Sequence, residues 1–249
     1  MLAQALSGLM CLFVLGRMRL MRFQKGDAMP DGAMLRELLR LGVPVGVMNS
    51  VTAVGGMILQ GVVNGFGSAT VAAYTTGVKI LSLAEQPGNI IGLSLSTYVG
   101  QNLGGGLLGR IKKGLHSATW IALLTSAVIT AAVLLLGRFA VALFISGTPE
   151  EVALSTEVAV HYLNIMSICL SVLYMLHIYR SALMGLGDTV MPMASGIVEF
   201  LMRIGVAIFL PALMGQEGIF YAEVAAWAGA AVLLVATYFV RMKKLARDF

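Results

Sequence analysis

The sequence predicts an all-α polytopic membrane protein, in which a lobe of six membrane-spanning helices follows a partial helix at the amino terminus. The composition is too apolar for a soluble domain, with 58% hydrophobic residues, 12% charged residues and a mean hydropathy of +0.88. The 249 residues leave room for six or seven spans of about 20 to 25 residues each. Lys and Arg cluster between the apolar stretches, as is typical of cytoplasmic loops.

The amino-terminal part divides into two expected regions. Residues 1–16 are apolar but short for a span, and we interpret them as the end of a truncated membrane helix. Residues 17–41 would form a cytoplasmic linker that begins with a basic cluster. Its part from Asp27 to Leu41 has helical periodicity, which fits either a short interfacial helix or an extra turn of the next span. Residues 42–249 would then form the six-span transporter lobe.

The positions of the basic residues test this topology. If the linker, the loops after the second and fourth spans and the carboxyl-terminal tail are cytoplasmic, only three of the 17 Lys and Arg residues fall elsewhere. These are Lys79, Arg138 and Arg203. We therefore expect a multi-pass protein of the cell (plasma) membrane, with both ends of the lobe in the cytoplasm. The expected spans are approximately 42–63, 71–106, 115–136, 152–183, 190–210 and 218–240.

The second span, Val71 to Gly106, is the most unusual, because polar residues follow one side of an apolar helix. At about 100° per residue they occupy an arc of roughly 120°. Pro87 lies within this stretch and should bend the helix and free backbone carbonyls. Such a stripe at membrane depth indicates a wet cleft or a buried partner. Its candidate substrate- or ion-binding residues are Tyr74, Lys79, Glu85, Gln86 and Asn89.

Glu85 is the leading candidate for a functional carboxylate. A buried carboxylate of this kind could exchange a proton or help to ligate Na⁺, as in the broken helices of transporters. The alternative is a structural ion pair with Lys79 or another basic residue.

Further polar candidates occupy the other spans. Asn49 interrupts the first span, and Glu157, His161 and Asn164 form a second stripe on the fourth. Glu199 and Arg203 are four residues apart on the fifth, the spacing of a helix ion pair, and we favour their mutual neutralisation. Glu157, on the fourth span, and Glu223, on the sixth, would lie near the outer ends of their helices, within reach of water.

Several other functions find no support in the sequence. The GQNLGGG run lacks the Lys-Ser/Thr of a phosphate-binding loop, so we interpret it as a tight cytoplasmic turn. His161 and His177 are not spaced with Cys or carboxylates as metal ligands, and no metal site is predicted. There is no nucleophile–base constellation and no nucleic-acid-binding module. We expect neither an enzyme nor a cofactor beyond the coupling ion.

Two motifs, GQNLGGGLLGRIKKG and later RSALMGLGDT, resemble the MATE family of multidrug and toxic compound extrusion transporters, in its carboxy-terminal half. The segment from Leu39 to Leu81 is similar to that family's seventh span and the start of its eighth. The resemblance implies two six-helix lobes with substrate between them, and export driven by Na⁺ or H⁺. Residues 1–16 match the tail of the sixth span.

This chain departs from the family pattern at two acidic positions. Ser50-Val51-Thr52 and Ser171 to Tyr174 stand where relatives carry acidic residues in the seventh and tenth spans. The role of Glu85 therefore rests on its local physical chemistry.

The function expected is secondary active efflux of organic cations or drugs, coupled to Na⁺ or H⁺ antiport, by one lobe of a MATE-like transporter. Its partners would be membrane lipid, a drug-like substrate, and either the missing amino-terminal lobe or a second copy. One alternative is a flippase for a lipid-linked precursor, which would need a more basic cleft than Lys79 and Arg203 supply. The other is a non-transporting membrane fragment or interaction subunit.

Overall fold

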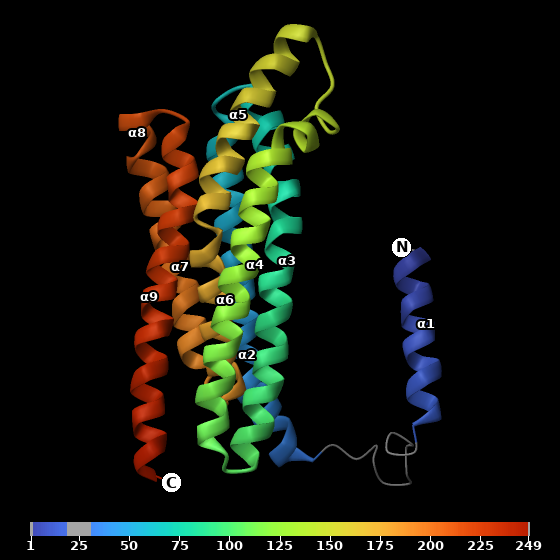
Figure 1. The fold of residues 1–249 in the computed structure, drawn as a ribbon, viewed down its shortest axis with the longest axis vertical. Helices are drawn as coiled ribbons and strands as arrows, with labels where there is room; N and C mark the ends of the chain where they lie inside the picture. Colours follow the sequence, from blue (N-terminus) through green and yellow to red (C-terminus); the bar gives the residue numbers. More distant parts are fainter. Residues whose placement is uncertain (1, 19–30, 249) are drawn as a thin grey trace. The chain divides into compact units, whose positions relative to one another are not determined.

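The computed structural model describes residues 2–18 and 31–248, and every regular element in these ranges is an α-helix. The chain divides into two units, residues 1–40 and 41–249. The first contains α1 (Leu2–Arg17) and the second contains the helical bundle (Figure 1). The remaining helices are α2 (Gly32–Asn64), α3 (Ser68–Gly104), α4 (Leu108–Ala142), α5 (Pro149–Ile168), α6 (Leu170–Gly185), α7 (Val190–Phe209), α8 (Pro211–Met214) and α9 (Glu217–Asp248).

These helices confirm the predicted six-helix membrane lobe. Among the described residues, four stretches are long and apolar enough to cross a membrane: α2, α4, α7 with α8, and α9. The bent pair α5 and α6 forms a fifth candidate span. The sixth long helix of the lobe is α3, whose 37 residues carry the polar stripe and which is not among the stretches that are apolar enough by composition. α3 continues as one helix through Pro87, and the GQNLGGG run forms its carboxyl-terminal end and a turn, in which Gly106 has a φ of 69°.

The fourth span differs from the prediction of a continuous helix over residues 152–183. It bends by 48° between α5 and α6, at Cys169. The physical reason lies at Ser167, whose backbone carbonyl accepts a hydrogen bond from the Thr130 hydroxyl of α4 at 2.6 Å. A side chain that enters the backbone ladder in this way is a known cause of sharp kinks.

The linker region is described only in part. Residues 32–41 are continuous with the first span, because α2 begins at Gly32 and ends at Asn64. This agrees with the extra-turn alternative and not with a separate interfacial helix. Most of the predicted basic cluster, together with Asp27 to Pro30, lies outside the described residues.

The centre of the bundle is the close approach of α3 and α6. A Cβ atom built on Gly185 of α6 would lie 2.6 Å from the Ser96 carbonyl oxygen and 2.8 Å from Val99 Cβ, both of α3. Two turns away, a Cβ on Gly88 would lie 2.6 Å from the Tyr174 ring. The Tyr174 hydroxyl donates a hydrogen bond to the Ala84 carbonyl at 2.7 Å. Small residues that let helix backbones approach are typical of membrane helix packing.

This packing gives a first prediction, for Gly185→Ala. The added methyl group meets backbone rather than a movable side chain, so we expect a loss of about 1–3 kcal/mol in the free energy of unfolding. Gly109→Ala is the matched control, because nothing lies within 4 Å of a Cβ at that helical position. Thermal unfolding of the two variants in detergent measures the difference. Equal melting temperatures would contradict the close contact.

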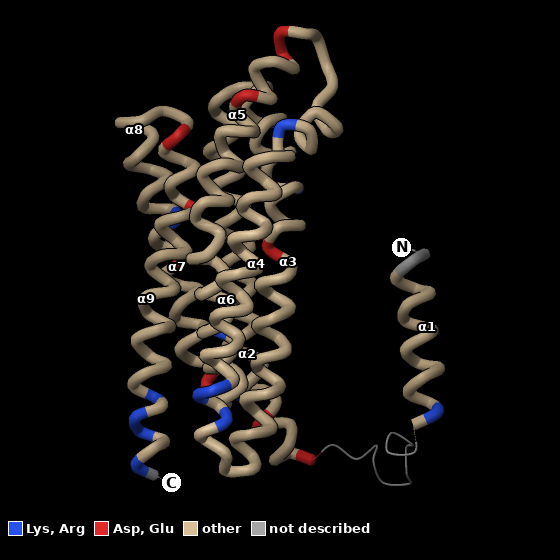
Figure 2. The backbone as a smooth tube through the Cα atoms, in the orientation of Figure 1, with Lys and Arg blue, Asp and Glu red and all other residues tan. Residues whose placement is uncertain are grey.

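Charge is distributed unevenly between the two ends of the bundle. Figure 2 shows basic residues gathered at one end, in the first turns of α4 and the last turns of α9. The opposite end carries the acidic first turn of α5, with Glu150 and Glu151. There Thr148 caps the helix, and hydrogen bonds from its hydroxyl and backbone amide lower the pKa of the Glu151 carboxyl.

Candidate functional site

The main cavity of the bundle is a partly open cleft of about 550 Å³, bounded by α2, α3, α5, α6, α7 and α9. Small or flexible side chains of α2, including Gly56 and Met57, form one wall. The opposite walls carry the charged residues. The polar and aromatic residues that line the cleft are Thr52, Gln60, Tyr74, Ser82, Glu85, Tyr162, His177, Arg180, Glu199, Arg203, Glu223 and Trp227.

A buried network of four charged residues from three helices forms one side of this cleft. Glu199 of α7 accepts hydrogen bonds from Arg203 Nη2 at 3.0 Å and from Arg180 Nη2 of α6 at 2.9 Å. Arg203 Nη2 also donates to Glu223 of α9 at 3.1 Å. The side chains are between 6% and 14% exposed, so these charges are held almost entirely by one another.

The predicted pair of Glu199 and Arg203 is therefore confirmed, but as part of a larger network. The prediction for Glu223 is wrong, since its side chain is only 14% exposed and is paired with Arg203 rather than hydrated at the end of its helix. Arg180 was expected with the cytoplasmic residues after the fourth span, and it instead donates to both Ser195 and Glu199.

One residue of α2, Gly55, lies against this network. A Cβ on Gly55 would lie 3.1 Å from Arg203 Nη1 and 3.2 Å from the Phe200 ring, so α2 passes directly over the guanidinium. The Nε atoms of Arg180 and Arg203 and the Thr52 hydroxyl are buried and find no hydrogen-bond partner among the residues that the structure describes. Unpaired polar groups in a cleft are available to water or to a ligand.

Glu85 differs from the other carboxylates of the cleft. It is half-buried on α3, and the described residues give its carboxylate neither an ion pair nor a hydrogen bond. Lys79, the partner considered for a structural pair, is exposed and does not line the cleft. With two arginines and three glutamates, the cleft has a formal charge of −1 when Glu85 is ionised and zero when it is neutralised.

The structure brings together only some of the predicted site residues. Tyr74, Glu85, Glu199 and Arg203 line the cleft. The other candidates do not, because the polar arc on α3 is wider than the face that the cleft occupies, and because the stripe on α5 turns outward. His161 bonds Glu217 at 3.2 Å on the surface, and Asn164 is half-buried. The remaining candidates are exposed: Asn49, Lys79, Gln86, Asn89 and Glu157.

Sequence reasoning missed Arg180, His177, Tyr162 and Trp227 as cleft residues. A signal for Arg180 was present in α7, where Ser195, Glu199 and Arg203 repeat every four residues and form a polar ridge on one helix face. All three are buried, so a further charged partner was required. No pattern in the sequence indicates the aromatic residues, which look like ordinary core positions.

Comparison with known proteins identifies the family. The family model MatE matches residues 44–209, about two thirds of the chain. This chain belongs to the MatE family. The probable multidrug resistance protein YoeA of Bacillus subtilis (strain 168) is 28% identical over 91 residues, which cover 36% of this chain and 20% of that protein. Members of this family are transporters and not enzymes.

Solved MATE structures share the fold. A MATE protein in complex with MaL6 aligns with a TM-score of 0.88 at 17% identity, over 99% of this chain and 56% of that chain. A multidrug resistance MATE transporter of the MOP superfamily, in an outward-facing conformation, aligns with a TM-score of 0.84 at 19% identity, over 95% of this chain and 54% of that chain. A MOP superfamily transporter from Pyrococcus furiosus is described as having a binding pocket of reverse polarity. It aligns with a TM-score of 0.85 at 18% identity, over 94% of this chain and 54% of that chain. This MatE chain thus spans about half the length of these relatives.

Proposed function

We propose that this chain forms one lobe of a secondary active exporter, which moves organic cations or drug-like compounds out of the cell in exchange for Na⁺ or H⁺. The observation that carries the proposal is Glu85, a carboxylate that has no partner among the described residues and that lines a cleft whose other charged side chains are paired with one another. Family membership supports transport, and the multidrug resistance relative supports the substrate class.

The charge balance of the cleft supports exchange of one cation for another. Arg180 and Arg203 neutralise Glu199 and Glu223, so ionised Glu85 supplies the net negative charge that attracts an organic cation. A proton or Na⁺ on Glu85 removes that charge. Substrate and coupling ion therefore compete for one carboxylate, and a site that holds either of them, but not both together, produces antiport.

The aromatic lining supports an organic rather than an inorganic cargo. Tyr74, Tyr162 and Trp227 all contact the cavity. Tyr74 and Tyr162 also contact each other, with ring centroids 5.3 Å apart. Aromatic faces attract cations with about 0.5 to 2 kcal/mol each and bury the apolar part of a ligand. A site for a small inorganic ion alone would not need these aromatic side chains.

A second lobe is part of the proposal, because the cleft is open on one side and the solved relatives are about twice as long. That lobe could be another part of the same protein, a separate chain or a second copy of this one. Cysteine cross-linking in native membranes distinguishes them by the mass of the product, with Cys11 and Cys169 replaced and a single Cys introduced at the exposed Asn49 of α2. A uniform monomer that lacks a preceding lobe would favour the non-transporting subunit.

The flippase alternative requires a cleft that attracts phosphate groups. Both arginines of the cleft are already paired with glutamates, and Lys79 lies outside it. The net charge therefore disfavours an anionic lipid-linked substrate in this cleft.

We place the protein in the plasma membrane, with the basic end of the bundle toward the cytoplasm. Cytoplasmic loops of membrane proteins carry an excess of Lys and Arg.

The experiment that tests the proposal uses the chain reconstituted with its second lobe in proteoliposomes. The liposomes are loaded with high Na⁺ or with a low internal pH, and uptake of a fluorescent organic cation is followed from outside. We expect uptake that depends on one of the two gradients and stops when an ionophore collapses it. Uptake that persists without either gradient, or flipping of a lipid-linked sugar under the same conditions, would overturn the assignment.

A further inference from the structure

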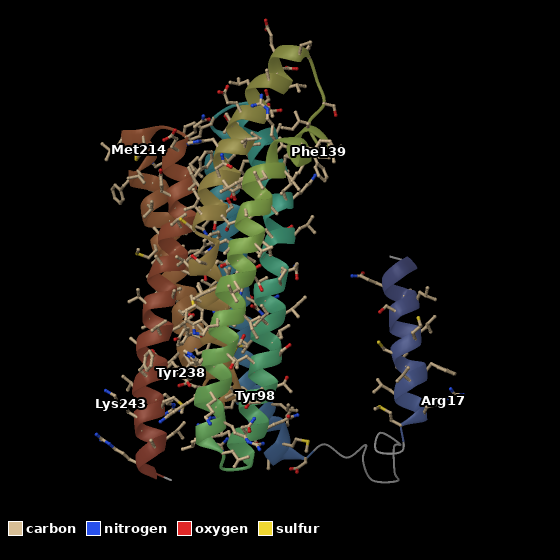
Figure 3. The ribbon with its side chains drawn as sticks, in the orientation of Figure 1. Arg17, Tyr98, Phe139, Met214, Tyr238 and Lys243 are labelled. Atoms are coloured by element: carbon tan, nitrogen blue, oxygen red, sulfur yellow. The ribbon has the colours of Figure 1, made fainter. Side chains whose placement is uncertain are left out.

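A second hollow lies at the basic end of the bundle, away from the proposed transport cleft. It consists of two adjoining cavities of about 440 and 290 Å³, which share Lys112 of α4 with Tyr238 and Phe239 of α9. The floor includes Tyr179 of α6, on which both flanking helices pack. Figure 3 shows Tyr238 on the stretch of α9 that precedes its basic end, where Lys243 lies. We call this hollow the α4–α9 groove.

Among the side chains that the structure describes, the rim of the groove carries positive charge without an acidic partner. Lys112, Lys243 and Arg247 line it and are exposed, and none of the three forms an ion pair with a described residue. Asp188 forms an ion pair with Arg241 of α9 at 3.3 Å. None of the described residues that line the two cavities is Asp or Glu. Three unpaired cations on one rim favour an anionic ligand.

The interior of the groove is apolar and aromatic. Phe239 is 54% exposed and lies beside Tyr238, with ring centroids 5.7 Å apart, while Leu115 and Met242 complete the wall. A soluble phosphate would meet only the rim and would leave this surface in contact with water. A ligand with a charged head and a hydrocarbon body matches both parts.

Tyr238 adds an independent observation. The residue is 2% exposed, it lines both cavities, and its hydroxyl has no hydrogen-bond partner among the described residues. A buried donor left without a partner costs about 1–3 kcal/mol, so native proteins usually satisfy it. Because Tyr238 lines both cavities, a ligand that fills the groove lies against this residue, and the hydroxyl is a donor that such a ligand would satisfy.

We infer that the α4–α9 groove binds an anionic phospholipid of the surrounding membrane. The headgroup phosphate contacts Lys112, Lys243 and Arg247, an acyl chain covers Phe239 and Met242, and the Tyr238 hydroxyl donates to a glycerol-ester or phosphate oxygen. Basic hollows between membrane helices near an interface are suited to such lipids. The site is separate from the transport cleft and does not depend on the proposed transport function.

The test measures lipid retention by the full chain in nanodiscs of mixed phosphatidylglycerol and phosphatidylcholine. Native mass spectrometry then counts the phosphatidylglycerol that stays bound after release. A direct contact between a cationic side chain and the bound headgroup phosphate contributes about tenfold to affinity, whereas a basic residue outside the groove makes no such contact. We therefore expect the triple variant Lys112→Gln, Lys243→Gln, Arg247→Gln to lower selective retention by at least about tenfold. The matched control removes equal charge from the same end outside the groove, through Arg110→Gln, Lys113→Gln and Lys244→Gln, and should retain the lipid.

Tyr238→Phe separates a ligand role from a packing role. The ring remains, and removal of an unpaired hydroxyl should leave thermal stability in pure detergent unchanged or higher. We expect it to reduce phosphatidylglycerol retention about threefold or more. Equal retention by the groove and control triple variants, or displacement of the lipid by inorganic phosphate alone, would overturn the inference. Selective retention unaffected by Tyr238→Phe would remove the tyrosine from the site.

Discussion

Replacing Glu85 by glutamine is expected to abolish ion-coupled transport while the protein still reaches the membrane and folds. The substitution keeps the size of the side chain and removes the charge for which substrate and coupling ion compete. No ion pair is broken, because the described residues give the Glu85 carboxylate no basic partner. The variant therefore tests the role of this carboxylate in transport while the stability of the bundle is left unchanged.

The size of the effect follows from the interaction that is lost. A hydrogen bond or close contact to a charged group is worth about 1.5 to 3 kcal/mol. Affinity for an organic cation should thus fall about tenfold to 100-fold, since about 1.4 kcal/mol corresponds to a factor of ten. Exchange should stop altogether, because the uncharged amide can neither take up nor release the coupling ion in each cycle. Efflux of a fluorescent cation and equilibrium binding of the same compound measure the two parts.

Glu157→Gln is the matched control for this prediction. Glu157 is exposed on α5 and does not line the cleft, so its loss should leave gradient-driven efflux and binding unchanged. The comparison holds the chemical change constant and varies only the position. Full coupled efflux by Glu85→Gln, or the same loss in both variants, would exclude Glu85 as the coupling carboxylate.

The fold was largely predictable from the sequence, because membrane helices are set by length, hydropathy and the placement of basic residues. The second span shows this well: the expected stretch 71–106 and the observed α3, Ser68–Gly104, agree to within a few residues. The kink between α5 and α6 was not predictable, since it depends on the Thr130 hydroxyl from α4, a contact between residues distant in the chain. Tertiary contacts of this kind leave no local signal.

The site was predictable only where one helix carries the relevant pattern. The spacing of Glu199 and Arg203 gave their ion pair, and the cost of a charge at membrane depth singled out Glu85. Arg180 and Glu223, which pair with Glu199 and Arg203, lie on other helices. Their position near a helix end in the sequence did not indicate that their side chains are buried. On α3 the polar arc did not show which part of it faces the cleft, because that depends on how α2 and α7 pack.

Arg203→Met is expected to give the largest loss of stability of the variants considered. Arg203 is 5% exposed and bridges Glu199 and Glu223, with distances of 3.0 and 3.1 Å. Its removal leaves Glu223 buried without the cation that neutralises it. Breaking a buried ion pair on one side costs about 3–5 kcal/mol, far more than the pair contributes as a whole. We expect a melting temperature in detergent lowered by many degrees and a low yield of folded protein.

Arg138→Met is the control for loss of an arginine as such, because Arg138 is exposed and forms no ion pair with a described residue. Its melting temperature should match that of the parent chain. The double variant Arg203→Met with Glu223→Gln removes both the cation and the carboxylate that it leaves behind, and should recover part of the loss. Recovery would locate the cost in the unpaired carboxylate. An unchanged melting temperature in the single variant would contradict this cost and would mean that a proton or a bound cation neutralises Glu223 once Arg203 is gone. Glu223 would then join Glu85 as a second candidate for ion binding.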